Sequence, residues 1–190
     1  ATRKRALSPY SVAGTHNSGA GLSAGAIDAV HRIVNDQGRI TASFVQSLQP
    51  GVSIEQYVEL VGVTVLVFSI DEFNRGLGVA PAALPVPVPG EPSHYRPARI
   101  DDSTGFVPMV AADGAIGEEA DLWPNGRSAN VLRALSLVPN AFREWIPVAA
   151  AQYLSFADMA NFDQPPGRSL HRTQIELVAG RVSAVNECFY

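Results

Sequence analysis

The chain has 190 residues, of which 46% are hydrophobic and 17% are charged, with a net charge of −4 and a pI of about 5.5. This composition is typical of a globular protein and excludes disordered, collagen-like and coiled-coil chains. The negative net charge argues against a nucleic-acid partner. Arg3, Lys4 and Arg5 form the only basic cluster, and a solvated terminus explains it without any partner.

Targeting signals and disulfides are not indicated. The longest apolar run, LVGVTVLVFSI at residues 60–70, has 11 residues, whereas about 20 are needed to cross a bilayer. No stretch has the charged start and apolar middle of a signal peptide. Cys188 is the only cysteine, so the chain cannot form an internal disulfide. We therefore expect a soluble cytoplasmic protein with no membrane partner.

Residues 1–21 are small, polar and Gly-rich, and we predict a flexible N-terminal arm there. A first helical half is predicted over 22–79. Its first helix begins after Ser23, a good N-cap residue, and is broken by NDQG at 35–38. A second helical segment follows from Ile40 to Leu48, where QPG stops it.

Residues 52–78 are the most informative part of this half. Ser53 and Gln56 have the spacing of a capping box, and Gly76 or Gly78 can end a helix. The middle is rich in β-branched residues, which leaves a buried strand as an alternative. The length favours a helix, because strands are much shorter. Apolar residues on nearly every face predict that this helix is buried among other helices.

The next segment, 80–127, is predicted to connect two halves of the molecule. Residues 79–97 contain six prolines, which neither a helix nor a central strand tolerates, so an extended, polyproline-like conformation is expected. Residues 98–127 have several turn motifs, and we predict a long irregular link with one short turn.

A second helical half is predicted over 128–190. Helical patterns resume at Ser128 and are interrupted by Pro139, and Pro147 is expected to kink the next helix or to lie in its first turn. The last helix is predicted after Ser169, a plausible N-cap residue. Five apolar residues fall on one side of it: Leu177, Val178, Val182, Val185 and Phe189.

The two richest helical segments also align without a gap. Residues 53–73 and 170–190 match at an offset of 117, which places Glu59 on Glu176 within a shared Glu-Leu-Val motif. We predict that the molecule contains a duplicated helical unit. The second copy carries Cys188 where the first carries an aspartate, so only one copy has a reactive thiol.

The segment QIELVAGRVSAVNECFY resembles the alkylhydroperoxidase D-like and carboxymuconolactone decarboxylase superfamily. Redox-active members carry a glutamate, eleven intervening residues, and then Cys-x-x-Cys-x-x-x-His. Glu176 and Cys188 have this spacing, and Asn186 precedes the cysteine by two residues as in many relatives. Residues 129–153 resemble the helical pair before the motif, and 22–79 resemble the segment after it, so the halves are in reversed order.

The resemblance implies an all-α fold in which two related halves form an alkylhydroperoxidase D-like helical bundle. It also implies a thiol-dependent peroxidase or disulfide reductase of antioxidant defence. Cys188 would be the redox thiol and Glu176 its acid–base partner, and His31 can face the site from the other half. The second cysteine and the histidine of the motif fall beyond Tyr190, so we expect the 190-residue chain to be a poor peroxidase by itself.

The same resemblance sets the expected partners. They are a hydroperoxide or another small-molecule substrate, a protein dithiol as reductant, and further copies of the chain in a homo-oligomer. No metal, flavin or haem is expected, because no clustered Cys/His spacing supports a metal site. Two alternatives stay open. One is a carboxymuconolactone decarboxylase-like lactone enzyme, and the other is a catalytically silent helical module that only oligomerises.

Each candidate residue also has a structural interpretation. Glu176 can be an ion-paired helical glutamate, with Arg172 four residues before it. Cys188 can be a buried small apolar residue, and His31 a packed, hydrogen-bonded one. On one straight helix, the thiol lies twelve positions after the glutamate, which separates the two by about 18 Å. The two meet within one chain only if the helix bends, and Gly180 is the expected place.

Overall fold

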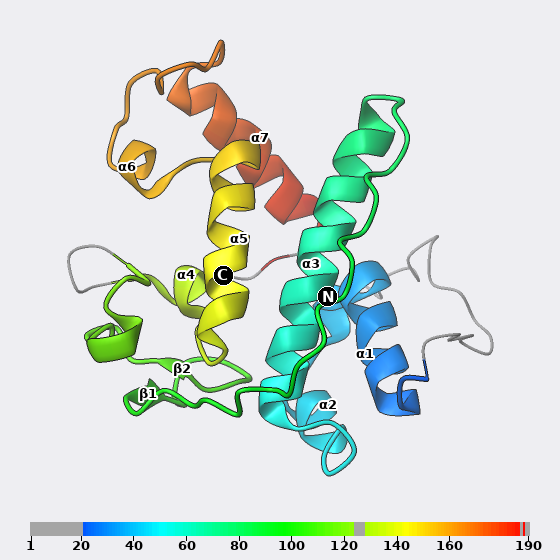
Figure 1. Ribbon diagram of the computed structural model, residues 1–190. Coiled ribbons are helices and arrows are strands. Elements are labelled where there is room, and N and C mark those ends of the chain that lie inside the picture. The colour runs from blue at the N-terminus through cyan, green and yellow to red at the C-terminus, as the bar shows by residue number, and fades with distance from the viewer. Residues whose placement is uncertain (1–20, 124–127, 187, 189–190) are drawn as a thin grey trace, which may run out of the picture. The chain divides into compact units, whose positions relative to one another are not determined.

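The computed structural model describes residues 21–123, 128–186 and 188 (Figure 1). This part of the chain is mostly helical, with seven α-helices and one hairpin of two-residue strands, so the all-α prediction is confirmed at this level. The predicted arm, except for Gly21, lies outside the described residues. None of the described helices is both long and apolar enough to cross a membrane.

The chain divides into two compact units, which are described one at a time. The first ends at Phe142 and the second begins at Arg143, so the boundary lies within helix α5 (Pro139–Gln152) rather than before residue 128. The reason is that the start of α5 belongs to the core of the first unit. The Phe142 ring meets the edge of Trp123 at a centroid distance of 6.0 Å and an angle of 82°.

The first two helices follow the local capping rules. Helix α1 (Ala24–Asn35) begins after Ser23, whose hydroxyl accepts the backbone N–H of the third residue beyond it. A short 3₁₀ turn then leads to helix α2 (Ala42–Ser47), which Thr41 caps in the same way. Both predicted helices are thereby confirmed. The break between them, from Asp36 to Thr41, lies close to the one predicted from NDQG at 35–38.

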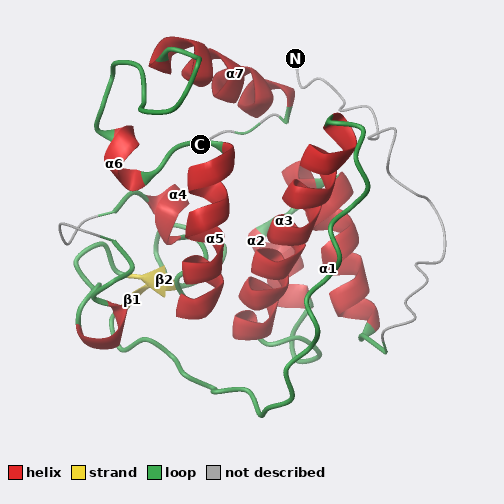
Figure 2. Cartoon of the chain, turned by 45° about the horizontal axis from the view of Figure 1, so that its top comes forward, coloured by secondary structure: helices red, strands yellow, loops and turns green. Residues whose placement is uncertain are grey.

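Helix α3 (Ile54–Gly76) is the longest described element and packs along α1 (Figures 1 and 2). Its capping box is complete. The Gln56 N–H donates to the Ser53 hydroxyl at 3.2 Å, and the Ser53 N–H donates to the Gln56 side-chain oxygen at 2.8 Å. The helix prediction is therefore confirmed over the strand alternative.

The prediction that α3 is buried on nearly every side is wrong. Tyr57, Val58 and Gly62 are buried, but Phe68 and Phe73 are 41% and 56% exposed. The three buried residues all lie in the first half of the helix, and Gly62 among them meets the start of α5. The large side chains of the second half therefore stay exposed. An apolar pattern around a helix shows what could be buried, not what is.

The core of the first unit lies where the first three helices meet. It is made by seven buried residues: Ala26, Ala29, Phe44, Val45, Leu48, Val52 and Tyr57. At the other contact of α3, a Cβ on Gly62 would lie 3.0 Å from the Cβ of Ala141 at the start of α5. A glycine at this position therefore lets the two helices approach closely.

The Pro-rich segment 79–97 has no regular secondary structure, and all of it up to Arg96 is exposed. Both views show it running back beside α3 (Figures 1 and 2). Two side-chain contacts hold its end: Arg96 pairs with Glu55 in the first turn of α3, and the Tyr95 hydroxyl donates to Glu119. As predicted, this segment forms neither a helix nor a strand.

Most of the described part of 98–127 is irregular with one short turn, as predicted, but the prediction missed a pair of short strands and a buried end. Strand β1 (Ile100–Asp101) pairs antiparallel with strand β2 (Met109–Val110), and a 3₁₀ turn follows at Gly117–Glu119. Leu122 and Trp123 are almost fully buried. The Trp123 indole donates to the Ala112 carbonyl at 3.2 Å. Buried aromatic and aliphatic side chains turn this loop-rich segment into part of the core.

Two polar side chains after this segment form hydrogen bonds with the backbone of β2. Arg133, the last residue of the short helix α4 (Asn130–Arg133), is buried and donates to the Val110 carbonyl at 2.9 Å. The hydroxyl of buried Ser136 accepts the Val110 N–H at 2.8 Å. A buried two-residue strand needs such partners, because its backbone groups have lost their water.

The second unit holds the rest of α5, helix α6 (Phe156–Met159) and helix α7 (Arg172–Val185). Helix α5 continues through Pro147. Ser169 does not cap α7, so that prediction is wrong. His171 is the N-cap residue instead, because its side chain accepts the N–H of Thr173 while its own N–H is taken by the Gln174 side chain.

Candidate functional site

The structure places the three predicted site residues on separate elements. Glu176 lies in the first half of α7, Cys188 follows the end of that helix, and His31 lies half-buried on α1 of the first unit. Helix α7 continues through Gly180 without a break. About 14 Å of helix axis therefore separates Glu176 from Val185, and the structure does not bring Glu176 and Cys188 together within one chain.

Glu176 is the centre of a polar cluster. Its Oε1 accepts from Arg172 Nε at 2.6 Å and lies 2.6 Å from Arg172 Nη2. The same oxygen accepts the Tyr153 hydroxyl at 2.8 Å. The ion-paired interpretation of Glu176 is therefore confirmed. Its side chain is 43% exposed, so solvent still reaches the carboxylate.

Arg172 holds this cluster in place. It is buried, and its Nη1 donates to the backbone carbonyls of Asp158, Met159 and Asn161 at 2.9, 3.3 and 3.2 Å. One guanidinium thus ties the end of α6 and the loop after it to the first turn of α7. A planar cation with several donors suits this role, and its fixed position in turn orients Glu176.

Tyr153 is the second side chain that donates a hydrogen bond to Glu176, after Arg172. Partial burial raises the pKa of its phenol above the ordinary value, and the hydrogen bond and charge of Glu176 raise it further, while Arg172 acts in the opposite direction. The phenol therefore stays protonated at neutral pH and donates a hydrogen bond to the carboxylate. Tyr153 and Glu176 form a proton donor and acceptor pair beside a cavity that Tyr153 also lines.

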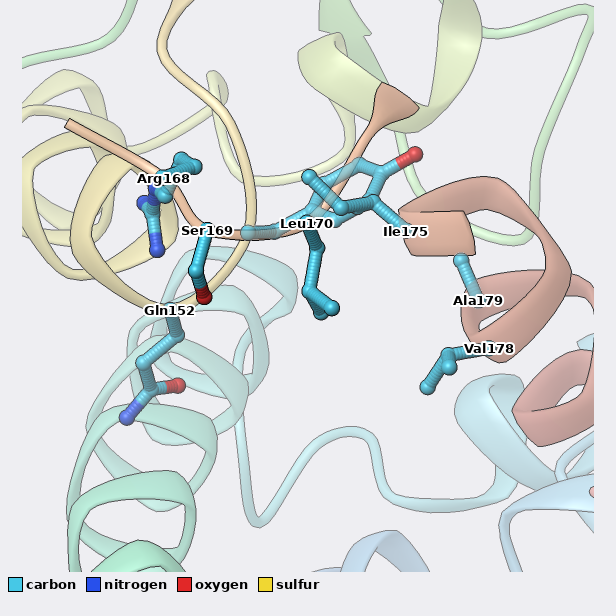
Figure 3. Close-up of a pocket in the computed structure, with 8 residues that line it drawn as sticks. Gln152, Arg168, Ser169, Leu170, Ile175, Val178 and Ala179 are labelled. Carbon is cyan, nitrogen blue, oxygen red and sulfur yellow. The ribbon is translucent and has the colours of Figure 1, made fainter. Parts of the chain in front are cut away.

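This cavity has a volume of about 310 Å³ and lies entirely within the second unit. Figure 3 shows Gln152, Arg168 and Ser169 on one side and Ile175, Val178 and Ala179 on the other. Leu170 and Tyr153 complete the lining. The cavity is open to solvent, since Val178 is 59% exposed.

Cys188 is exposed, which excludes its interpretation as a buried apolar residue. Its backbone N–H donates to the Ser183 carbonyl at 2.9 Å, so the turn after α7 holds the residue close to the helix end. An exposed thiol is open to oxidants and to a reductant. Within the described ranges, no group of three His, Cys, Asp or Glu side chains could hold a metal ion.

Sequence reasoning found one member of the Glu176 cluster and missed the other. The spacing of four residues indicates Arg172 as a partner. Tyr153 lies 23 residues before Glu176 on another helix, and no local pattern links the two. Arg168 and Gln152 were missed for the same reason.

Compared with protein-family models, curated proteins and solved structures, the chain matches none of them.

Proposed function

We propose that the protein is a thiol-dependent peroxidase or disulfide reductase of the alkylhydroperoxidase D type. Cys188 is its redox thiol and Glu176 its acid–base group. The observation that carries the proposal is the exposed position of Cys188 directly after α7, on the helix that also carries Glu176 at the spacing of that superfamily. A thiol that reacts with a peroxide must be accessible and must lose its proton.

The chemistry takes two steps. The Cys188 thiolate attacks the peroxide oxygen, the O–O bond breaks, and the leaving alkoxide takes a proton to give an alcohol and a sulfenic acid. A thiol of an external protein dithiol then displaces water from the sulfenic acid and forms a mixed disulfide. The second thiol of the same partner releases Cys188 and leaves the partner oxidised. An external dithiol is needed because Cys188 is the only cysteine among the 190 residues.

Glu176 requires a second copy of the chain to act on this thiol. Proton transfer requires hydrogen-bond reach of about 3 Å, directly or through a water, and an unbroken helix keeps the two groups of one chain far apart. We therefore propose a homo-oligomer in which Glu176 of one copy serves Cys188 of another. The exposed apolar side of α7 supports an assembly: Leu177, Val178, Val182 and Val185 are each more than half exposed.

The same exposed side favours a second candidate, a catalytically silent helical module that only oligomerises. The two candidates differ in the reactivity of Cys188. A thiol that reacts with peroxide faster than free cysteine supports the enzyme, and an inert thiol in a stable oligomer supports the module. A lactone enzyme would need no cysteine, so a substitution at Cys188 separates it from the thiol mechanism.

The test measures peroxide consumption by the full chain with dithiothreitol as the reductant. Cys188→Ser should abolish turnover, and Glu176→Gln should slow thiol oxidation by roughly 10²-fold, the scale for losing a general base. Glu59→Gln is the matched control, because Glu59 is the exposed counterpart on α3, and it should change nothing. Turnover that survives Cys188→Ser would overturn the thiol mechanism.

The assembly is tested separately by light scattering. A particle of at least twice the 20.2 kDa chain is expected at micromolar concentration, and Val182→Asp should shift it toward the monomer, because a charge cannot be buried cheaply in an apolar contact. A monomeric wild-type chain would contradict the proposed role of Glu176 across two copies. It would leave the reactivity of Cys188 itself to be measured.

A further inference from the structure

The cavity of the second unit has a polar side whose side-chain hydrogen-bonding groups are partly without partners among the described residues. Arg168 Nη2 donates to the carbonyls of Ala150 and Ala151 at 2.8 and 3.0 Å, at the end of α5, and these bonds fix the guanidinium. Its Nε and Nη1 bond to no acceptor among the described residues. The same holds for the side chains of Gln152 and Ser169. Figure 3 shows these three side chains close together on one side of the cavity.

The opposite side is aliphatic. Ile175, Val178 and Ala179 are three and four residues apart on α7, so they share one helix face. Leu170, just before the helix, completes this wall. A volume of about 310 Å³ is at the lower end of small-molecule sites. The wall therefore fits a short alkyl chain rather than a large or branched group.

The charge of the site favours an anion. Arg168 is the only charged residue that lines the cavity. The nearby carboxylate of Glu176 is already matched by Arg172, so the cavity keeps an excess positive charge. A guanidinium with two free donors, a hydroxyl and a carboxamide are suited to a planar carboxylate.

We propose that this cavity binds a small amphipathic carboxylate. The carboxylate contacts Arg168, Ser169 and Gln152, and the alkyl chain lies against Leu170 and Val178. This site goes beyond the proposed redox function and does not use its chemistry, because neither Cys188 nor Glu176 lines the cavity. Val178 is the one lining residue that also lies on the exposed side of α7 proposed to meet another copy. Its success or failure therefore leaves the thiol chemistry to be judged separately.

Three probes test the proposal on the full chain by isothermal titration calorimetry. Hexanoate has both the charge and the chain, acetate has only the charge, and 1-hexanol has only the chain. Hexanoate should bind one site per chain at least about tenfold more tightly than either of the others, since each lacks one of the two contributions. Equal binding of hexanoate and 1-hexanol would overturn the assignment of the polar side.

Variants locate the site. Arg168→Gln should weaken hexanoate by about 10- to 100-fold, the usual effect of losing a charged hydrogen bond. Because Arg168 also holds the end of α5, Val178→Asp provides a second test, and it should abolish binding through like charge. Val131→Asp is the matched control, since Val131 is similarly exposed, at 58%, but lies on α4 in the first unit and does not line the cavity. Equal losses in the two aspartate variants would overturn the proposal.

Discussion

Helices α3 and α7 carry the same Glu-Leu-Val motif but lie in different environments. Leu60 and Val61 on α3 are partly buried against the core that α1 and α2 form. Their counterparts on α7, Leu177 and Val178, are 75% and 59% exposed. The difference shows that the motif supplies an apolar surface, whereas the neighbouring helices decide whether that surface is covered.

The starts of the two helices sharpen this comparison. Both begin with a complete capping box, but the N-cap residues Ser53 and His171 are 118 residues apart, one more than the offset that aligns Glu59 with Glu176. The aligned glutamates therefore differ by one position in their distance from the helix start. At the offset of 117, Glu55 of α3 stands where α7 has Arg172, so only Glu176 has a cation four residues before it, and this pair ties it to its own unit.

The largest expected effect is the loss of a buried side chain from α3. Tyr57 is 5% exposed in the core, so Tyr57→Ala should lower the free energy of unfolding by about 3–5 kcal/mol. Leu177→Ala on α7, made in the Val182→Asp variant that should be monomeric, should change it by no more than about 0.5 kcal/mol. Urea unfolding followed by circular dichroism measures both. A loss above about 1 kcal/mol for Leu177→Ala in this monomeric background would show that the chain itself covers this side of α7.

A second difference between the helices is that a residue of α3, Tyr57, makes the free energy of unfolding depend on pH in the alkaline range. Burial raises the pKa of Tyr57 from 10.0 to about 12, so the folded state holds this proton more tightly than the unfolded state. Its contribution to stability is complete below pH 10 and decreases between pH 10 and about 12, by up to about 3 kcal/mol. Tyr57→Phe should flatten this part of the curve of unfolding free energy against pH. The same steep decrease in the phenylalanine variant would assign it to other groups.

The smallest expected effects come from replacing one glycine by leucine in each helix, and the two replacements should change the free energy of unfolding in opposite directions. Gly62→Leu places a side chain against Ala141 and should lower the free energy of unfolding by about 1–3 kcal/mol. Gly180→Leu meets no atom within 4 Å of its Cβ and should raise that free energy by about 0.5–1 kcal/mol, because glycine is a poor helix former. Thermal unfolding of both variants measures the difference. Effects of the same sign would remove this distinction between the helices.

Local rules predicted much of the fold. Ser23 and the Ser53–Gln56 pair gave the correct helix starts, since capping depends on a few adjacent residues. The residues of 98–127 were misjudged, because the burial of Trp123 depends on Phe142, which is distant in the sequence. Glycine and proline indicate turns, but they do not show whether the chain between them belongs to the core.

The candidate site was less predictable than the fold. The ion pair of Arg172 and Glu176 follows from spacing on one helix. The contact of Tyr153 with Glu176 joins two helices through a loop, and no periodicity encodes it. Cys188 was singled out by its spacing from Glu176, and its role as the redox thiol stays a prediction. Its distance from the carboxylate depends on whether the helix bends, and the residue types around Gly180 do not determine that.

The exposed Pro-rich segment has a consequence for how the sequence can vary. Its residues from Val79 to Arg96 are exposed, and the side chains of Tyr95 and Arg96 tie its end to the rest of the unit. Lengthening it would disturb no buried contact and would add mainly closure entropy, roughly 0.6 kcal/mol for each doubling of the loop. Insertions and deletions between homologous chains should therefore concentrate here, while the elements on either side keep their lengths.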